Sequence, residues 1–129
     1  MRKISTLPVL MMMLSLSACI TLQAPVNTAE SPEQKAFALY GTFVNIQEVA
    51  ARHVTSGKAT DSQIKLIQSA DAIAYPLAVA LKDAAFAYRD AKEGKLKQDA
   101  YIELERSFAD ASNSIHDMIN LVVNLIEGN

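Results

Sequence analysis

Apolar side chains recur at alternating spacings of three and four residues through the last third of the chain. A seam that repeats every 3.5 residues is typical of a helix that packs lengthwise against a neighbouring helix. The pattern predicts a helix from about Lys97 to Glu127, ending before Gly128. The seam consists of Tyr101, Leu104, Phe108, Ala111, Ile115, Met118, Val122 and Leu125.

Two earlier segments show the same periodicity. From Ser31 to about Ser56, one apolar stripe contains Ala36, Leu39, Phe43, Ile46 and Ala50. From Thr60 to about Glu93, a first stripe contains Ile64, Ile67, Asp71, Ala74, Ala78, Leu81, Ala85 and Tyr88. A second stripe beside it contains Leu66, Ala70, Ile73, Leu77 and Ala84. Because this helix has two apolar stripes, we expect it to pack against both of the others.

Capping residues mark the predicted helix boundaries. Ser31 with Gln34, and Thr60 with Gln63, each match the capping box, in which two side chains satisfy free backbone N–H groups. Gly94 is expected at the left-handed position that follows the second helix. These signals place the starts of two helices and the end of one.

Two residues interrupt the helical pattern. Pro76 lies inside the second helix, where its ring and its missing N–H normally cause a kink. The alternative is a break at Pro76, which would produce a four-helix domain. Gly41 lies inside the first helix and costs about 1 kcal/mol relative to alanine. We expect close packing, or contact with a partner, to be the reason for this glycine.

Residues 31–129 are therefore predicted to form one all-α domain. No segment shows the alternation of apolar and polar residues that is typical of a half-buried strand. The connections between the helices are short, which favours antiparallel neighbours. The predicted fold is an antiparallel up-down-up three-helix bundle with a long second helix kinked near Pro76.

The N-terminal segment has a different character. Arg2 and Lys3 precede an apolar stretch at residues 7–16, which is too short for a membrane-spanning helix of about 20 residues. The run Leu16-Ser17-Ala18-Cys19 follows and contains the one cysteine of the chain. A charged start, an apolar middle and small residues before a cleavage point are the parts of a secretory signal peptide. The tetrapeptide resembles the lipobox of bacterial lipoproteins.

This resemblance implies that residues 1–18 are a signal peptide and that Cys19 is lipidated and becomes the new N-terminus. Residues 19–30 would form a lipidated, flexible tether between the membrane and the helical domain. Ile20 follows the cysteine instead of the aspartate that often retains such proteins in the inner membrane. In a Gram-negative host, the resemblance therefore implies an anchor in the outer membrane, with the domain facing the periplasm.

Asp71 is the one charged residue in an otherwise apolar seam. Antiparallel packing would bring it level with the middle of both other helices, where Asn45, Gln47, His116 and Asn120 lie. Asp71, His116 and Asn45 could form a buried polar layer. In that layer, Asp71 and His116 could act as an acid–base or ligand-binding pair. The favoured alternatives are a hydrogen-bonded layer that sets the helix register, or an Asp71 side chain that faces solvent, because a catalytic site also needs a pocket and further convergent groups.

Other kinds of site lack the residues that they need. The two histidines, His53 and His116, have no spacing that would form a zinc site with neighbouring ligands. No phosphate-binding glycine loop or serine-hydrolase motif is present. The formal net charge of −2 argues against a nucleic-acid partner. We therefore expect no enzyme activity, no cofactor and no metal.

The sequence as a whole favours a small membrane-anchored lipoprotein of the bacterial envelope that binds or scaffolds another protein. Its predicted architecture is similar to that of the helical pilotin lipoproteins, although no motif of that family is present. Two alternatives stay open. One is a prophage or mobile-element surface lipoprotein that excludes infection or modifies the envelope. The other is a small-ligand binder that uses Asp71 and His116.

Overall fold

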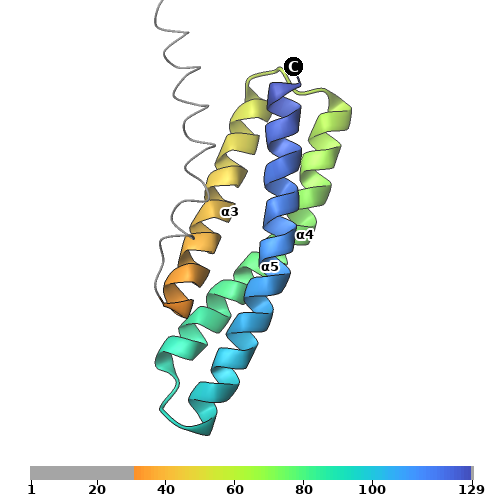
Figure 1. Ribbon diagram of the computed structural model, residues 1–129. Coiled ribbons are helices and arrows are strands. Elements are labelled where there is room, and N and C mark those ends of the chain that lie inside the picture. The colour runs from red at the N-terminus through yellow and green to blue at the C-terminus, as the bar shows by residue number, and fades with distance from the viewer. Residues whose placement is uncertain (1–30, 129) are drawn as a thin grey trace, which may run out of the picture.

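The computed structural model describes residues 31–128, which form three helices and no strand. The helices are α3 (Pro32–Thr55), α4 (Asp61–Asp90) and α5 (Lys95–Glu127). They run up, down and up in one bundle, and each helix contacts both others (Figure 1). The predicted all-α three-helix bundle is therefore confirmed for the described part of the chain.

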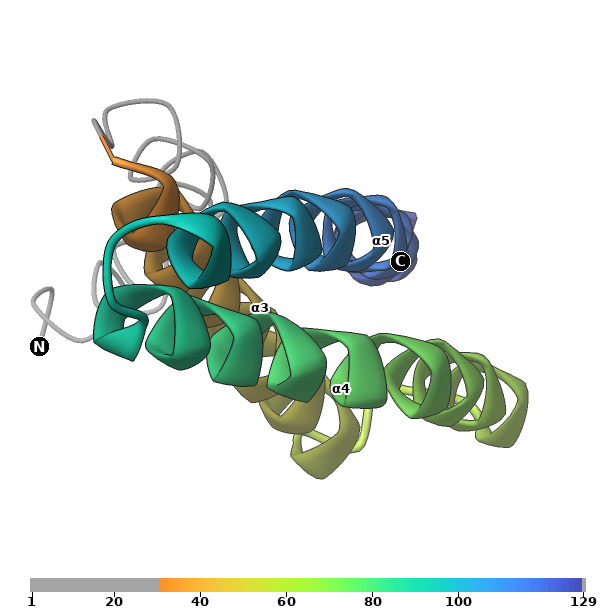
Figure 2. The same ribbon diagram turned by 90° about the horizontal axis from the view of Figure 1, so that it is seen from below.

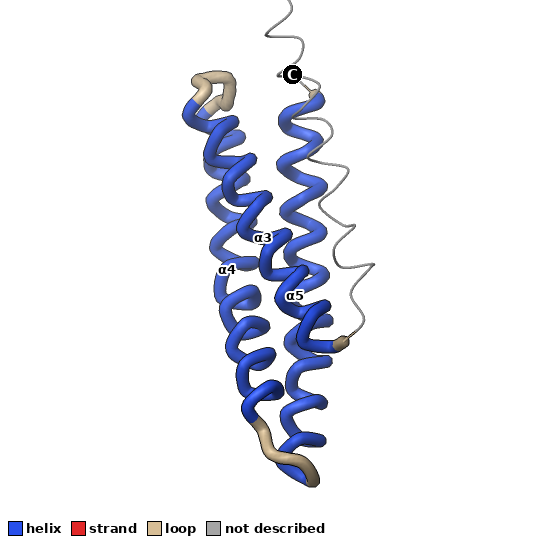
Figure 3. Tube along the Cα trace, turned by 90° about the vertical axis from the view of Figure 1, so that its left-hand side faces the viewer, coloured by secondary structure: helices blue, strands red, loops and turns tan. Residues whose placement is uncertain are grey.

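The helices do not all lie parallel. α3 is inclined to α5, as the views from below and from the side both show (Figures 2 and 3). α3 is also the shortest helix, with 24 residues against 30 and 33 in the other two. It starts well above the turn between α4 and α5, so among the described residues α4 and α5 alone form this end of the bundle.

Both predicted capping boxes are present. The Gln34 backbone N–H donates to the Ser31 hydroxyl at 3.2 Å, and the Ser31 N–H donates to the Gln34 side chain at 3.2 Å. Thr60 and Gln63 make the same reciprocal pair at 3.2 and 3.1 Å. Each box satisfies two backbone donors that a helix start leaves free, which explains why α3 and α4 begin at the predicted positions.

The expected role of Gly94 at the end of α4 is wrong. α4 ends at Asp90, and the chain turns extended at Ala91, three residues earlier than expected. Gly94 does have a positive φ of 96°, but it occupies the N-cap position of α5, which starts at Lys95. Such a backbone conformation is open mainly to glycine, so the residue serves the start of the third helix.

α4 continues through Pro76 as one helix, so the alternative with two separate helices is wrong. The helix changes direction near its middle, where it passes behind α5 in Figure 1. This agrees with the kink predicted at Pro76. Proline cannot donate to the carbonyl oxygen four residues earlier, here that of Ala72, and its ring crowds the same carbonyl.

The core follows the predicted seams. The largest fully buried side chains come from all three helices and are Phe43, Ile46, Leu81, Leu104, Ile115, Met118 and Val122. Burial of a side chain of this size contributes roughly 1.5–3 kcal/mol. Alanines fill the positions between them, and Ala36, Ala74, Ala78, Ala85 and Ala111 are fully buried. Small residues at these positions leave room for the large side chains of the facing helices.

Aromatic side chains line the contact between α3 and α4. The ring centroids of Phe37 and Phe86 lie 5.2 Å apart in an edge-to-face arrangement, and those of Phe43 and Tyr75 lie 6.3 Å apart. Aromatic pairs with such geometry contribute about 0.5–1.5 kcal/mol beyond the area that they bury. Both pairs lie on the side of α4 that faces α3.

Gly41 does not owe its presence to close packing within the bundle. A Cβ atom built at this position would meet no other heavy atom within 4 Å, apart from the backbone of its own helix turn. The expectation of close packing is therefore wrong for the described residues.

Candidate functional site

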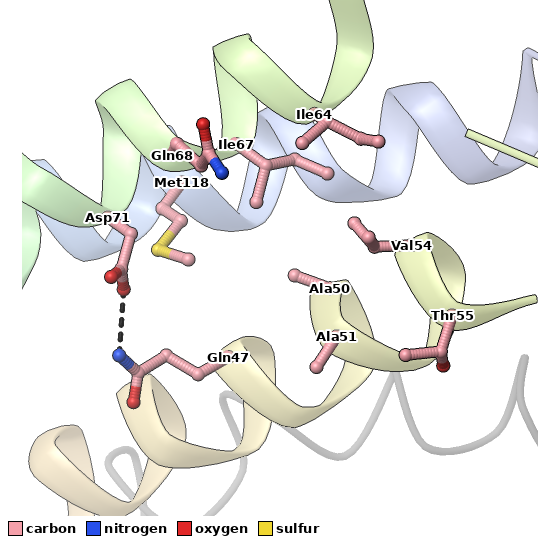
Figure 4. Close-up of a pocket in the computed structure, with 10 residues that line it drawn as sticks. All are labelled: Gln47, Ala50, Ala51, Val54, Thr55, Ile64, Ile67, Gln68, Asp71 and Met118. Atoms are coloured by element: carbon pink, nitrogen blue, oxygen red, sulfur yellow. Dashed lines mark hydrogen bonds between the residues drawn. The ribbon is translucent and has the colours of Figure 1, made fainter. Parts of the chain in front are cut away.

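A groove opens between the second half of α3 and the first half of α4, close to the turn that joins them (Figure 4). Its volume is about 330 Å³. Ten residues line it: Gln47, Ala50, Ala51, Val54, Thr55, Ile64, Ile67, Gln68, Asp71 and Met118.

The floor of the groove is apolar and built from three helices. Ala50 of α3, Ile67 of α4 and Met118 of α5 are 3%, 7% and 1% exposed. Val54 and Ile64 are half-buried and form the walls near the α3–α4 turn. Methionine side chains are flexible and adapt to differently shaped apolar groups. This floor therefore suits an apolar side chain supplied from outside.

One end of the groove is polar. The Gln47 amide nitrogen donates to a carboxylate oxygen of Asp71 at 2.7 Å, and this pair joins α3 to α4 across the groove. Both side chains are half-buried. Gln47 keeps its own amide oxygen, and Asp71 its second carboxylate oxygen, as acceptors for a donor at this end of the groove.

The predicted polar layer is only partly present. Asp71 pairs with Gln47, but Asn45 and His116 are exposed, so the expected buried layer of Asp71, His116 and Asn45 is wrong. Asn120 is exposed as well. These residues do lie near the middle of the bundle, as the register argument required. The side chains of Asn45 and His116 point away from the core. Each is next in sequence to a buried residue, Ile46 or Ile115, and successive residues of a helix point about 100° apart.

His116 makes its closest described polar contact within its own helix. Its Nδ1 lies 3.4 Å from the Ser112 hydroxyl, one turn earlier in α5. No described contact links His116 with Asp71. The groove itself contains one carboxylate and no histidine, so its chemistry is that of a binding surface with hydrogen-bond acceptors at one end.

His53 is the other histidine, and it lies in the last turn of α3. It is buried, and its Nε2 atom has no hydrogen-bond partner among the described residues. The Ser56 hydroxyl donates to the backbone oxygen of His53 at 2.7 Å, which satisfies one free carbonyl at the helix end. His53 does not line the groove. Within residues 31–128, no group of three or more His, Cys, Asp or Glu side chains could hold a metal ion.

The opposite end of the bundle carries a second set of polar contacts. The Lys97 ammonium lies 3.9 Å from the Tyr88 ring centroid and donates to the Tyr88 backbone oxygen near the end of α4. The Glu105 carboxylate raises the pKa of Tyr101, because a nearby negative charge disfavours the phenolate. The Lys97 contacts join α5 to the end of α4. An open hollow of about 460 Å³ lies beside this turn and is lined by Tyr88, Glu93, Gly94, Lys97, Gln98 and Tyr101.

The groove was not expected from the sequence. The seams contained Ala50, Ile64, Ile67 and Met118 as ordinary core positions. The sequence feature that could have indicated a groove is the placement of small residues opposite larger ones. Ala50 and Ala51 of α3 lie across the groove from Ile64 and Ile67 of α4. Whether such a pairing closes into a core or leaves a groove depends on the angle and distance between the helices.

The predicted lipidation site, Cys19, lies outside the described residues, as do the predicted signal peptide and tether in residues 1–30. Among the residues that are described, α4 is the one helix that is long and apolar enough, by length and composition, to cross a membrane. Comparison with known proteins finds no matching family model, and neither a curated protein nor a solved structure is significantly similar to this chain.

Proposed function

We propose that this protein is a lipid-anchored accessory or scaffolding module of the bacterial envelope that binds another protein through the α3–α4 groove. The observation that carries the proposal is the apolar groove floor of Ala50, Ile67 and Met118, which lies beside the Gln47–Asp71 acceptors. The proposal contains no catalytic step.

The groove favours a segment of protein as its ligand. A volume of about 330 Å³ is at the lower end of the roughly 300–1,000 Å³ found for small-molecule sites. A groove with one open side suits the apolar face of an amphipathic helix, which inserts side chains spaced one turn apart. Gln47 and Asp71 can accept a hydrogen bond from a polar residue or a free N–H group beside that face.

The N-terminal segment supports the membrane part of the proposal. A lipobox ending at Cys19 would attach the domain to a bilayer, and more than one acyl chain makes such an anchor stable. A tether of about eleven residues reaches at most about 36 Å. The groove would therefore meet partners at the same membrane, favoured here as the outer membrane facing the periplasm of a Gram-negative cell.

The test is crosslinking and affinity capture from native envelopes with a variant that fills the groove. Ala51 is exposed on the groove rim, so Ala51→Arg should block the groove without disturbing the core. Ala109 is exposed on α5, and Ala109→Arg is the matched control. We expect a partner that is captured by the wild type and by Ala109→Arg but lost with Ala51→Arg.

A Cys19→Ala variant separates the two halves of the proposal. If Cys19 carries the anchor, this variant should no longer be found in the envelope membrane fraction. The purified variant should still bind the purified partner. Capture that is equal for Ala51→Arg and Ala109→Arg would refute the groove as the binding site. Membrane retention of Cys19→Ala would refute the lipid anchor.

A further inference from the structure

The groove between α3 and α4 is lined by a single charged side chain, that of Asp71. Within residues 31–128, no lysine, arginine or histidine forms an ion pair with this carboxylate. Its described polar partner is the uncharged Gln47 amide, 2.7 Å away. The side chain is half-buried, so its negative charge lies in a partly desolvated place without an opposite charge from the described residues.

Other charges close to the groove have partners or lie outside it. Arg52 and Glu48 form an ion pair with each other on the exposed side of α3. Lys65 is exposed and does not line the groove. The partial charges of helix ends act within about one turn, whereas Asp71 lies ten residues after Asp61, where α4 starts. Asp71 therefore supplies the charge that a bound segment meets.

The spacing between the apolar and the charged parts of the groove is set by α4. Ile64, Ile67 and Asp71 all line the groove from this helix. A helix advances by about 1.5 Å per residue, so Asp71 lies about 6 Å beyond Ile67 and about 10 Å beyond Ile64 along the axis. A second helix laid along α4 would match both parts with side chains that are one to two turns apart.

A basic side chain complements this charge. The second carboxylate oxygen of Asp71 accepts no described hydrogen bond, and bonds from an ammonium or guanidinium group to a carboxylate are about twice as strong as neutral ones. An uncharged ligand residue would cover the carboxylate without a charged partner, which costs free energy. An acidic residue would add repulsion between like charges. The groove chemistry therefore ranks basic above neutral above acidic segments.

We propose that the α3–α4 groove selects an amphipathic helix of another protein that carries a lysine or arginine one to two turns from its apolar anchor, and that Asp71 selects it. The inference rests on the proposed function, because it names the chemistry of the segment that the groove binds. The apolar floor supplies contact area, and Asp71 supplies specificity. Asp71 also sets the direction of the bound helix, because the basic residue must lie at the polar end of the groove.

The test measures the binding of designed peptides to the full-length protein by fluorescence anisotropy. Phosphatidylcholine nanodiscs are present to hold a lipid anchor, and nanodiscs without protein are the blank. Three helical peptides share two leucines one turn apart and differ at one position a turn further on, which is lysine, glutamine or glutamate. With the wild type, the Kd of the lysine peptide should be about tenfold lower than that of the glutamine peptide, and the Kd of the glutamate peptide should be higher than both.

Variants at Asp71 test the cause of this order. Asp71→Asn removes the charge and keeps an oxygen that can accept the Gln47 hydrogen bond, so the fold should be retained. The three peptides should then bind with Kd values within about twofold of one another. In Asp71→Lys, the glutamate peptide should bind best.

A matched control makes the same charge change elsewhere. Asp110 is exposed on α5, and Asp110→Asn should keep the wild-type order of the three peptides. A lysine preference that persists in Asp71→Asn would overturn the role of Asp71. Circular dichroism of every variant checks that the helices are retained.

Ala51→Arg distinguishes a failure of this inference from a failure of the proposed function. Equal binding of the three peptides that is abolished by Ala51→Arg would overturn the charge selection and leave the groove as a binding site. Failure of every peptide to bind would also overturn the inference, because the peptides carry the spacing that it requires. The proposed function is judged separately, by capture of a partner from native envelopes.

Discussion

Asp71 shows what one polar residue does in an apolar seam. It is half-buried and shares a 2.7 Å hydrogen bond with Gln47, while its neighbours along the seam, Ile67 and Ala74, are buried. A hydrogen bond at such a partly solvated position contributes about 0.5–1.5 kcal/mol net. The pair therefore shapes the polar end of the groove more than it holds the bundle together.

The substitution Asp71→Leu should accordingly leave the protein folded. We expect the free energy of unfolding to change by about 1 kcal/mol or less, because the lost hydrogen bond is offset by a larger apolar contact between α3 and α4. Urea unfolding followed by circular dichroism measures the change. Loss of the folded state would show that Asp71 specifies the helix register, and Gln47→Leu serves as the control from the other side of the pair.

His53 is a second polar residue at a buried position, but its Nε2 atom has no partner among the described residues. An unpaired buried nitrogen costs free energy, by about 1–3 kcal/mol in proteins. The side chain lies in the last turn of α3, at the negative end of the helix dipole.

At the scale of the elements, local signals explain where the helices begin. Ser31 and Thr60 each accept a hydrogen bond three residues on, and each receives one in return. Helix ends are less well marked in the sequence. α4 ends at Asp90, although residue types that favour helices continue as far as Glu93. The positive φ of Gly94 redirects the chain into α5, which is a requirement of the turn and not of α4.

Gly41 lowers the stability of α3, and no close packing contact at this position compensates for it. The structure has open space at the position of a Cβ atom, and its backbone is helical. Gly41→Ala should therefore raise the free energy of unfolding by about 1 kcal/mol, because alanine restricts the unfolded chain and favours the helix. Thermal or urea unfolding tests this. An unchanged or lower stability would instead indicate that Gly41 contacts something outside the described residues.

At the scale of the whole molecule, stability depends on one continuous core along all three helices. Leu81 of α4 is fully buried in it, whereas Leu96, in the first turn of α5, is 67% exposed. The same residue type thus occupies the two extremes of burial in one domain. This contrast permits a matched test of the fold itself.

Leu81→Ala should lower the free energy of unfolding by about 2–5 kcal/mol, because it removes buried apolar surface and leaves a cavity. Leu96→Ala should change it by about 0.5 kcal/mol or less. Chemical denaturation of both variants under the same conditions measures the difference. Equal effects of the two substitutions would contradict the burial of Leu81 in the core of the bundle.

The sequence alone was sufficient for the number, order and approximate length of the helices. Helical period and capping are local properties, so they can be recognised from residues a few positions apart. The same holds for the lipobox-like run that ends at Cys19, although its lipidation stays a prediction. Pro76 likewise predicted a bend in α4 from its own chemistry.

Only the tertiary structure decided which residues face one another across helices. Register arguments placed Asn45, Gln47, Asp71 and His116 at one level, but helix rotation brought Gln47 to Asp71 and turned the other two outward. The groove at Ala50, Ile67 and Met118 also depends on how the helices cross. A rotation of 100° per residue decides between core and solvent, and that rotation is set by packing among all three helices.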